Sequence, residues 1–121
     1  MEEHSAQQLS FEGKILEDGY NRLYLTYASQ ADERFFGFGE QFTYFDMKGK
    51  QLPILVMEQG VGRGEQPISF FVDIAAKSAG EWHTSYAGVP HYVTSEMRSL
   101  FLKNNEHSIF DMTQPDKVQI S

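Results

Sequence analysis

Two glycine-rich segments contain the residues whose types and spacing could do chemistry. In the first, Phe35–Phe42, Gly37 and Gly39 alternate with phenylalanines, and Glu40 and Gln41 follow. Alternate glycines leave one face of a strand bare, so that another backbone or a ligand can approach closely. A carboxylate in this apolar setting needs a partner or a solvent-filled mouth. The simpler alternative is a bulged strand with Glu40 on the solvent face, and the sequence leaves both interpretations open.

The second segment is Glu58–Glu65, in which three glycines stand at alternate positions. Glycines allow backbone conformations that other residues avoid, and Arg63 offers a cation between two glutamates. A phosphate-binding loop of the Walker type and a dinucleotide fingerprint are both excluded, because no Lys-Ser/Thr pair follows and no helix is predicted to begin here. Composition alone favours a mobile surface loop over a binding loop.

The histidines and aromatic residues give weaker evidence for a functional site than the two glycine-rich segments. The histidines lack metal-binding spacing and there is no cysteine, so we expect no metal site and no cofactor. No Ser/His/Asp or Cys/His arrangement can be argued from the sequence. Trp82, Tyr86 and Tyr92 could stack on a sugar ring, although aromatic residues of a β-sandwich more commonly belong to its core.

Composition narrows the class of protein. The 121 residues include 17 acidic and 10 basic side chains, for a formal net charge of -7, which disfavours nucleic acid and anionic membranes as partners. Hydrophobic residues make up 40% and aromatic residues 14%, too many for a disordered chain. The longest apolar run, Ile54–Met57, is too short to cross a bilayer, and residues 1–5 do not resemble a signal peptide. We expect a cytoplasmic, acidic globular domain.

The elements that position these residues are predicted to be strands, because apolar residues recur with a period of two. An Asp-Gly pair, Asp18–Gly19, predicts a hairpin turn between the first two predicted strands, Leu9–Ile15 and Leu23–Tyr27. The predicted strands are Leu9–Ile15, Leu23–Tyr27, Leu52–Met57, Ile68–Ile74, Tyr92–Ser95, Ser99–Lys103, Ser108–Met112 and Lys117–Ile120. This number of short strands predicts an all-β fold, an antiparallel sandwich or barrel. Residues 1–8 are predicted to be a disordered or frayed terminus, residues 9–121 one domain, and Ala75–Pro90 a long loop.

Taken together, these motifs resemble glycoside hydrolase family 31, in the bacterial branch that contains α-glucosidases and sulfoquinovosidases. The matching stretches are Phe36–Phe42, Asp46–Lys50, Pro53–Ile54, Glu58–Gly64, Ser85–Ser95 and Ser108–Asp111. The resemblance spans about Asn21 to Ser121. It implies an N-terminal β-sandwich of the galactose-mutarotase type, which precedes a catalytic (β/α)8 barrel. Sandwiches of this family usually have additional strands before the position of Leu9, so the resemblance implies that the sandwich here is incomplete.

The resemblance also implies roles for the two glycine-rich segments. Residues Glu58, Gln59, Gly60, Gly62 and Arg63 would form a loop that walls the sugar pocket of the barrel. Behind this loop would lie a supporting strand with Gly37, Gly39, Glu40 and Gln41. The glycines would allow close approach to the barrel, and Arg63 and Glu58 would donate or accept hydrogen bonds with substrate hydroxyls or an anionic substituent.

The chemistry of the family needs two carboxyl groups about 5–5.5 Å apart. Nothing here matches the motif around either catalytic aspartate, so no catalytic residue is predicted and the chain alone is expected to be inactive. The expected partners are therefore the barrel and, weakly, carbohydrate. Two alternatives stay open, a stand-alone carbohydrate-binding module and an oligomerisation domain that associates through exposed strand edges.

Overall fold

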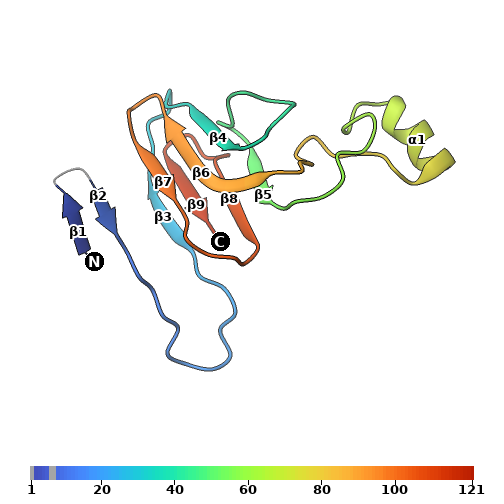
Figure 1. Ribbon diagram of the computed structural model, residues 1–121. Helices are drawn as coiled ribbons and strands as arrows, with labels where there is room; N and C mark the ends of the chain where they lie inside the picture. Colours follow the sequence, from blue (N-terminus) through green and yellow to red (C-terminus); the bar gives the residue numbers. More distant parts are fainter. Residues whose placement is uncertain (1, 6–7) are drawn as a thin grey trace.

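Two antiparallel sheets pack face to face around one hydrophobic core. The computed structural model describes residues 2–5 and 8–121 (Figure 1). One sheet has four strands in the order β3-β9-β8-β5, and the other has three in the order β4-β6-β7. Their bounds are β3 Leu25–Ala28, β4 Phe35–Gly39, β5 Gln51–Ile54, β6 Gly88–Thr94, β7 Ser99–Phe101, β8 Ser108–Asp111 and β9 Lys117–Ile120. The predicted all-β sandwich is confirmed.

The core lies between these sheets. Phe35, Phe38 and Tyr92 come from the three-stranded sheet, and their rings lie 5.3 and 5.4 Å apart in the pairs Phe35–Tyr92 and Phe38–Tyr92. Phe110 faces them from the four-stranded sheet, with its ring 5.2 Å from Phe38. The remaining buried apolar residues are Met47, Leu52, Met112, Val118 and Ile120. Aromatic rings thus supply much of the contact between the two sheets.

An ion pair between the buried Glu33 and the half-exposed Arg98 holds the end of the sandwich at the β6–β7 turn. The Glu33 carboxylate is fully buried, and Arg98 donates to both of its oxygens, with Nε 3.1 Å from Oε1. The backbone N–H of Gln30 donates to Oε2 at 3.2 Å. Burial alone would raise the pKa of Glu33, but these hydrogen bonds, that of Arg98 first, lower it to about 2.

Strand β4 is bulged. Its pairing with β6 is irregular between Gly37 and Gly39, and Phe38 between them has a φ of 63°. Glu40 follows in an exposed position. This geometry corresponds to the simpler of the two interpretations, a bulged strand with Glu40 on the solvent face.

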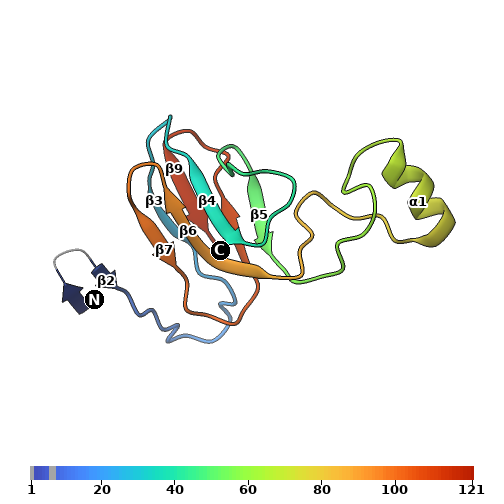
Figure 2. The same ribbon diagram turned by 45° about the horizontal axis from the view of Figure 1, so that its top comes forward.

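The N-terminal part of the chain differs from the prediction. Strands β1 (Glu2–Ser5) and β2 (Gln8–Ser10) form a hairpin that lies apart from the two sheets (Figures 1 and 2). Residues 11–24 contain no strand, so the predicted strand over Leu9–Ile15 is wrong apart from its first two residues. A turn does occur at Asp18 and Gly19. The predicted frayed terminus, residues 1–8, includes residues 1 and 6–7, which lie outside the described residues.

The prediction of a strand over Ile68–Ile74 is wrong, because helix α1 occupies Ile68–Ala76. Its two polar residues, Ser69 and Asp73, are four apart and share one side of a helix, whereas in a strand they would share one face with Phe71. The nearly continuous apolar run hid this spacing, since such runs occur in both buried strands and helices. Among the described residues, no helix is long and apolar enough to cross a membrane.

Candidate functional site

The chain between β5 and β6, residues 55–87, forms an arm that projects from the sandwich and carries α1 at its far end (Figures 1 and 2). Its outgoing and returning segments run side by side, joined by parallel bridges Val56–Ser85 and Val61–Ala79. Backbone hydrogen bonds of 3.0 Å connect the Met57 N–H to the Ser85 carbonyl and the Gly80 N–H to the Val61 carbonyl. The predicted pocket loop lies on the outgoing segment.

Two glycines allow the segments of the arm to touch. A Cβ on Gly60 would lie 2.4 Å from the Gly80 nitrogen, and a Cβ on Gly80 would lie 1.9 Å from the Gln59 carbonyl oxygen. Thr84, buried beside them, donates its hydroxyl to the Gln59 carbonyl at 2.7 Å. The close approach that these glycines provide in the structure is therefore between two parts of this chain.

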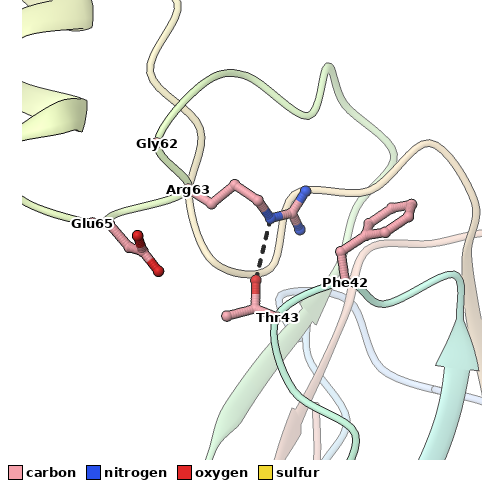
Figure 3. A pocket seen from close by; sticks show the side chains of 5 residues that line it. All are labelled: Phe42, Thr43, Gly62, Arg63 and Glu65. Carbon is pink, nitrogen blue, oxygen red and sulfur yellow. Dashed lines mark hydrogen bonds between the residues drawn. The ribbon is translucent and has the colours of Figure 1, made fainter.

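Arg63 ties the arm to the loop that follows β4. Its Nε donates to the Thr43 hydroxyl at 3.2 Å, and its Nη2 donates to the carbonyls of Trp82 and Thr84 at 3.3 and 2.9 Å. Its Cζ lies 5.0 Å from the centre of the Phe42 ring. Figure 3 shows the guanidinium between Thr43 and Phe42. Several donors of Arg63 are thus used inside the chain, and no ion pair of Arg63 occurs within the described residues.

A small open cleft of about 330 Å³ lies at this junction. Its lining residues are Phe42, Thr43, Gly62, Arg63 and Glu65. The Glu65 side chain leaves the backbone in a different direction from the guanidinium (Figure 3). A hydroxyl, a guanidinium and an aromatic ring along one edge suit a polar, hydroxylated ligand more than an apolar one.

Glu58 and Tyr86 form the second polar group of the arm. Both side chains are exposed, and the Tyr86 hydroxyl donates a hydrogen bond to Oε1 of Glu58. This hydrogen bond raises the pKa of Tyr86, because it favours the protonated phenol next to the carboxylate. The pair presents an oriented carboxylate to whatever faces this part of the arm.

The predicted supporting strand contacts the returning end of the arm. A Cβ on Gly39 would lie 2.0 Å from the Ala87 carbonyl oxygen, which accepts a 2.9 Å hydrogen bond from the Glu40 N–H. The buried Ser85 hydroxyl donates to the Glu40 carbonyl at 2.5 Å. Gln41 donates through Nε2 to the Phe38 carbonyl at 3.2 Å. The side chain of Glu40 does not point to the core, and its backbone fixes the root of the arm.

The three aromatic residues named as sugar platforms lie in three different environments. Tyr92 is 3% exposed and packs in the core, so its ring has no face for a ligand. Trp82 is half-buried against Tyr44, with the ring centres 5.5 Å apart. Tyr86 is exposed beside Glu58. The structure brings Tyr86 together with the predicted loop and places Tyr92 elsewhere.

Thr43, Thr84 and Ser85 were missed by the sequence interpretation, although they make the hydrogen bonds that fix the arm. The sequence gives only a weak indication of this role, because Thr84 and Ser85 are simply two hydroxyl residues between Trp82 and Tyr86. Among residues 8–121, whose side chains the structure describes, no group of three His, Asp or Glu side chains is placed to hold a metal ion.

Comparison with known proteins identifies relatives of this chain among characterised enzymes. No protein-family profile matches the sequence. The chain is 33% identical over 106 residues to a sulfoquinovosidase of Agrobacterium fabrum, which covers 87% of the chain and 16% of that enzyme. It is 32% identical over 103 residues to a sulfoquinovosidase of Escherichia coli, which covers 84% of the chain and 15% of that enzyme.

Solved structures share the fold. A GH31 family sulfoquinovosidase from E. rectale, in complex with an aza-sugar inhibitor, superposes with a TM-score of 0.76 at 24% identity, over 80% of this chain and 15% of its own. A cycloalternan-forming enzyme from Listeria monocytogenes gives a TM-score of 0.62 at 20% identity, over 80% of this chain and 8% of its own. A GH31 dextranase from Flavobacterium johnsoniae gives 0.60 at 16% identity, over 88% of this chain and 12% of its own.

The sandwich and its arm therefore correspond to one segment of the enzymes of glycoside hydrolase family 31, and the chain is homologous to that segment. The curated relatives that it matches are sulfoquinovosidases, and it spans 15–16% of their length. The resemblance stated from the sequence motifs is confirmed.

Proposed function

We propose that this chain is the non-catalytic N-terminal β-sandwich of a retaining α-glycosidase, and that residues 55–87 help to wall the sugar pocket of a catalytic (β/α)8 barrel. The observation that carries this proposal is the arm, which leaves the sandwich (Figure 1) and carries the exposed Glu58–Tyr86 pair and the cleft beside Arg63. The relatives named sulfoquinovosidase support a carbohydrate as the ligand. A cytoplasmic location belongs to the same proposal.

Within the pocket wall, Glu58 is the group that would contact the sugar, and Tyr86 would orient it. A carboxylate that accepts from two donors at once can bind a sugar hydroxyl and keep its tyrosine partner. Arg63 has a different task in this proposal, because its hydrogen bonds to Thr43, Trp82 and Thr84 fix the shape of the loop.

The test uses a chimera in which this chain replaces the matched segment of the E. coli sulfoquinovosidase. Glu58→Gln is expected to lower kcat/KM for an aryl α-glucoside or aryl α-sulfoquinovoside about tenfold or more, the value of a lost charge-assisted hydrogen bond. The melting temperature should stay unchanged, since Glu58 is exposed. Glu96→Gln, at the β6–β7 turn, is the matched control. Unchanged kinetics of Glu58→Gln would show that the arm does not wall the pocket.

The chain alone is expected to hydrolyse neither substrate, because it has no motif for the catalytic aspartates. Tryptophan fluorescence, which reports on Trp82, should show at most millimolar affinity for glucosides, since the arm would form only one wall of a pocket. Robust turnover by the 121-residue chain would overturn the non-catalytic assignment, and tight saturable binding would favour a stand-alone carbohydrate-binding module.

One observation favours the oligomerisation alternative. Strands β3, β5, β4 and β7 are the outer strands of their sheets and have no further neighbour among the described strands. Several apolar side chains of residues 9–25 are also exposed, with Leu16 at 86%. Unpaired edges and apolar surface promote association. Light scattering over a dilution series tests this, and a monomer at every micromolar concentration would exclude it.

A further inference from the structure

Helix α1 is an apolar helix that stands away from the sandwich. Figures 1 and 2 show it at the tip of the arm, with no sheet beside it. Its large apolar side chains are Ile68, Phe70, Phe71 and Ile74, exposed by 49%, 57%, 64% and 69%. Soluble helices normally turn such residues toward a core.

The orientation of α1 is the reverse of that expected for a surface helix. Its buried residue is Ser69, which packs against Gly62, where an added Cβ would lie 2.7 Å from the Ser69 hydroxyl oxygen. At 100° per residue, Asp73 lies near Ser69 on this polar side. The apolar residues occupy the rest of the circumference. The helix thus buries one polar residue, Ser69, against its own arm and leaves Phe70, Phe71 and Ile74 turned outward.

A nine-residue helix has little stability of its own in water. The N-cap residue, Pro67, makes no side-chain hydrogen bond, and the C-terminus is closed by one left-handed cap, in which the Lys77 N–H donates to the Asp73 carbonyl at 3.0 Å. Burial of the apolar side is the remaining source of stability. Within the described residues nothing covers Phe70, Phe71 and Ile74, so this side of the helix is free to contact another surface.

We propose that the apolar side of α1 docks into an apolar groove on the catalytic domain of the glycosidase. This inference rests on the proposed function and names the contact that would hold the arm in place. Arg63 and α1 are separated by only four residues, so a partner that meets the cleft also meets the helix. In the two curated relatives, about five-sixths of the length lies outside the matched segment and can supply this groove.

A second copy of the chain is a weaker candidate for the occupant. Each copy has a formal net charge of -7, so that close pairing of two copies brings like charges together. The charge of the molecule therefore favours a different partner.

Hydrogen–deuterium exchange of residues 68–76 tests the proposal. In the 121-residue chain alone these amides should exchange rapidly, and in the chimera at least about tenfold more slowly. Amides of β8 and β9 should be protected equally in both and serve as the internal control. Rapid exchange of α1 in a chimera whose β8 and β9 are protected would overturn the proposal.

Substitution provides the matched comparison. Phe71→Glu should abolish the slowing in the chimera and lower its melting temperature by several degrees, with no change in the melting temperature of the isolated chain. Met97→Glu, on the β6–β7 turn far from the arm, should do neither. An equal effect of Phe71→Glu in both settings would show that α1 stabilises the chain itself and would overturn the proposal.

Two further outcomes are decisive. If α1 of the isolated chain becomes protected as concentration rises, and sedimentation shows a dimer, the occupant is a second copy and the proposal is wrong. If the chimera does not fold, the isolated chain is mixed with the E. coli polypeptide that lacks its matched segment. If the α1 amides exchange no more slowly in that mixture, the docking proposal is also overturned. Because Glu58 is intact in these variants, docking can hold even where Glu58→Gln leaves the kinetics unchanged.

Discussion

The sandwich and the arm are stabilised by different interactions. The sandwich encloses nine buried apolar residues between its sheets, and at one end the buried Glu33 forms an ion pair with Arg98. The arm buries hydroxyl groups instead, those of Thr84 and Ser85, and leaves the large apolar residues of α1 exposed. The sandwich therefore has a hydrophobic core of its own, whereas the arm has a defined backbone but leaves apolar side chains exposed. This difference is what we expect of a domain whose arm completes an interface with another domain.

The largest expected effect comes from the core. Phe110→Ala removes a fully buried ring that contacts Phe38 and Tyr92, and should lower the free energy of unfolding by about 3–5 kcal/mol. Phe71→Ala removes the same ring from α1, where it is exposed, and should cost less than about 0.5 kcal/mol in the isolated chain. Urea unfolding measures both. Similar losses for the two variants would contradict the division into a sandwich with its own core and an arm with exposed apolar side chains.

Acid should act on the sandwich more than on the arm, through Glu33. Its pKa is about 2 in the folded chain against an ordinary value of 4.5, and this difference corresponds to about 3 kcal/mol at most. A lowered pKa stabilises the fold above pH 4.5, and that contribution is lost as the pH falls from 4.5 towards 2. Urea unfolding at a series of pH values should show this slope in the wild type. Glu33→Gln should flatten it and Glu96→Gln should keep it; an equal slope in all three would contradict the assignment.

The arm has its own weak point in the contact of Gly60 with Gly80. Gly80→Ala places a methyl group 1.9 Å from the Gln59 carbonyl oxygen, so the two segments must separate. We expect exchange of the Val61 and Gly80 amides to rise about tenfold or more, while the free energy of unfolding of the sandwich changes by less than about 0.5 kcal/mol. Gly88→Ala, whose Cβ would lie 3.6 Å from Ile54, is the control. A loss of global stability in Gly80→Ala alone would show that the arm and sandwich unfold as one unit.

The smallest expected effect is electrostatic and confined to the arm. Glu58→Gln removes the charge that accepts the Tyr86 hydroxyl, so the pKa of Tyr86 should fall toward its ordinary value of 10.0. The ultraviolet absorbance of the tyrosinate form measures this, and the difference from Tyr86→Phe isolates the signal of Tyr86. An unchanged pKa would mean that the two side chains do not pair in solution.

Most of the sandwich was predictable, and the arm was not. Period-two alternation located β8 and β9 closely, because each has one face in the core. It failed over Ile68–Ile74, since an exposed apolar helix has no polar outer face to reveal its period. It failed again over residues 11–15, where alternating apolar residues find no partner strand in this chain.

The candidate site also has features that the sequence predicted and features that only the structure showed. Glycine spacing identified Glu58, Gly60, Gly62 and Arg63 as a special loop, and the structure places all four on the arm. The spacing did not reveal that Gly60 meets Gly80, because that contact joins segments far apart in the sequence. For Tyr92 the sequence left a sugar platform and a core position open, since a period of two does not tell which sheet face is buried, and the structure places it in the core.

By itself the sequence determined an acidic, strand-rich domain, and its motifs pointed to its family, because charge, hydrophobic period and motif spacing are local properties of the chain. The tertiary structure alone decided that Arg63 binds carbonyls of the returning segment and that α1 turns its apolar side outward. Both depend on which distant residues the fold brings within hydrogen-bonding or van der Waals distance.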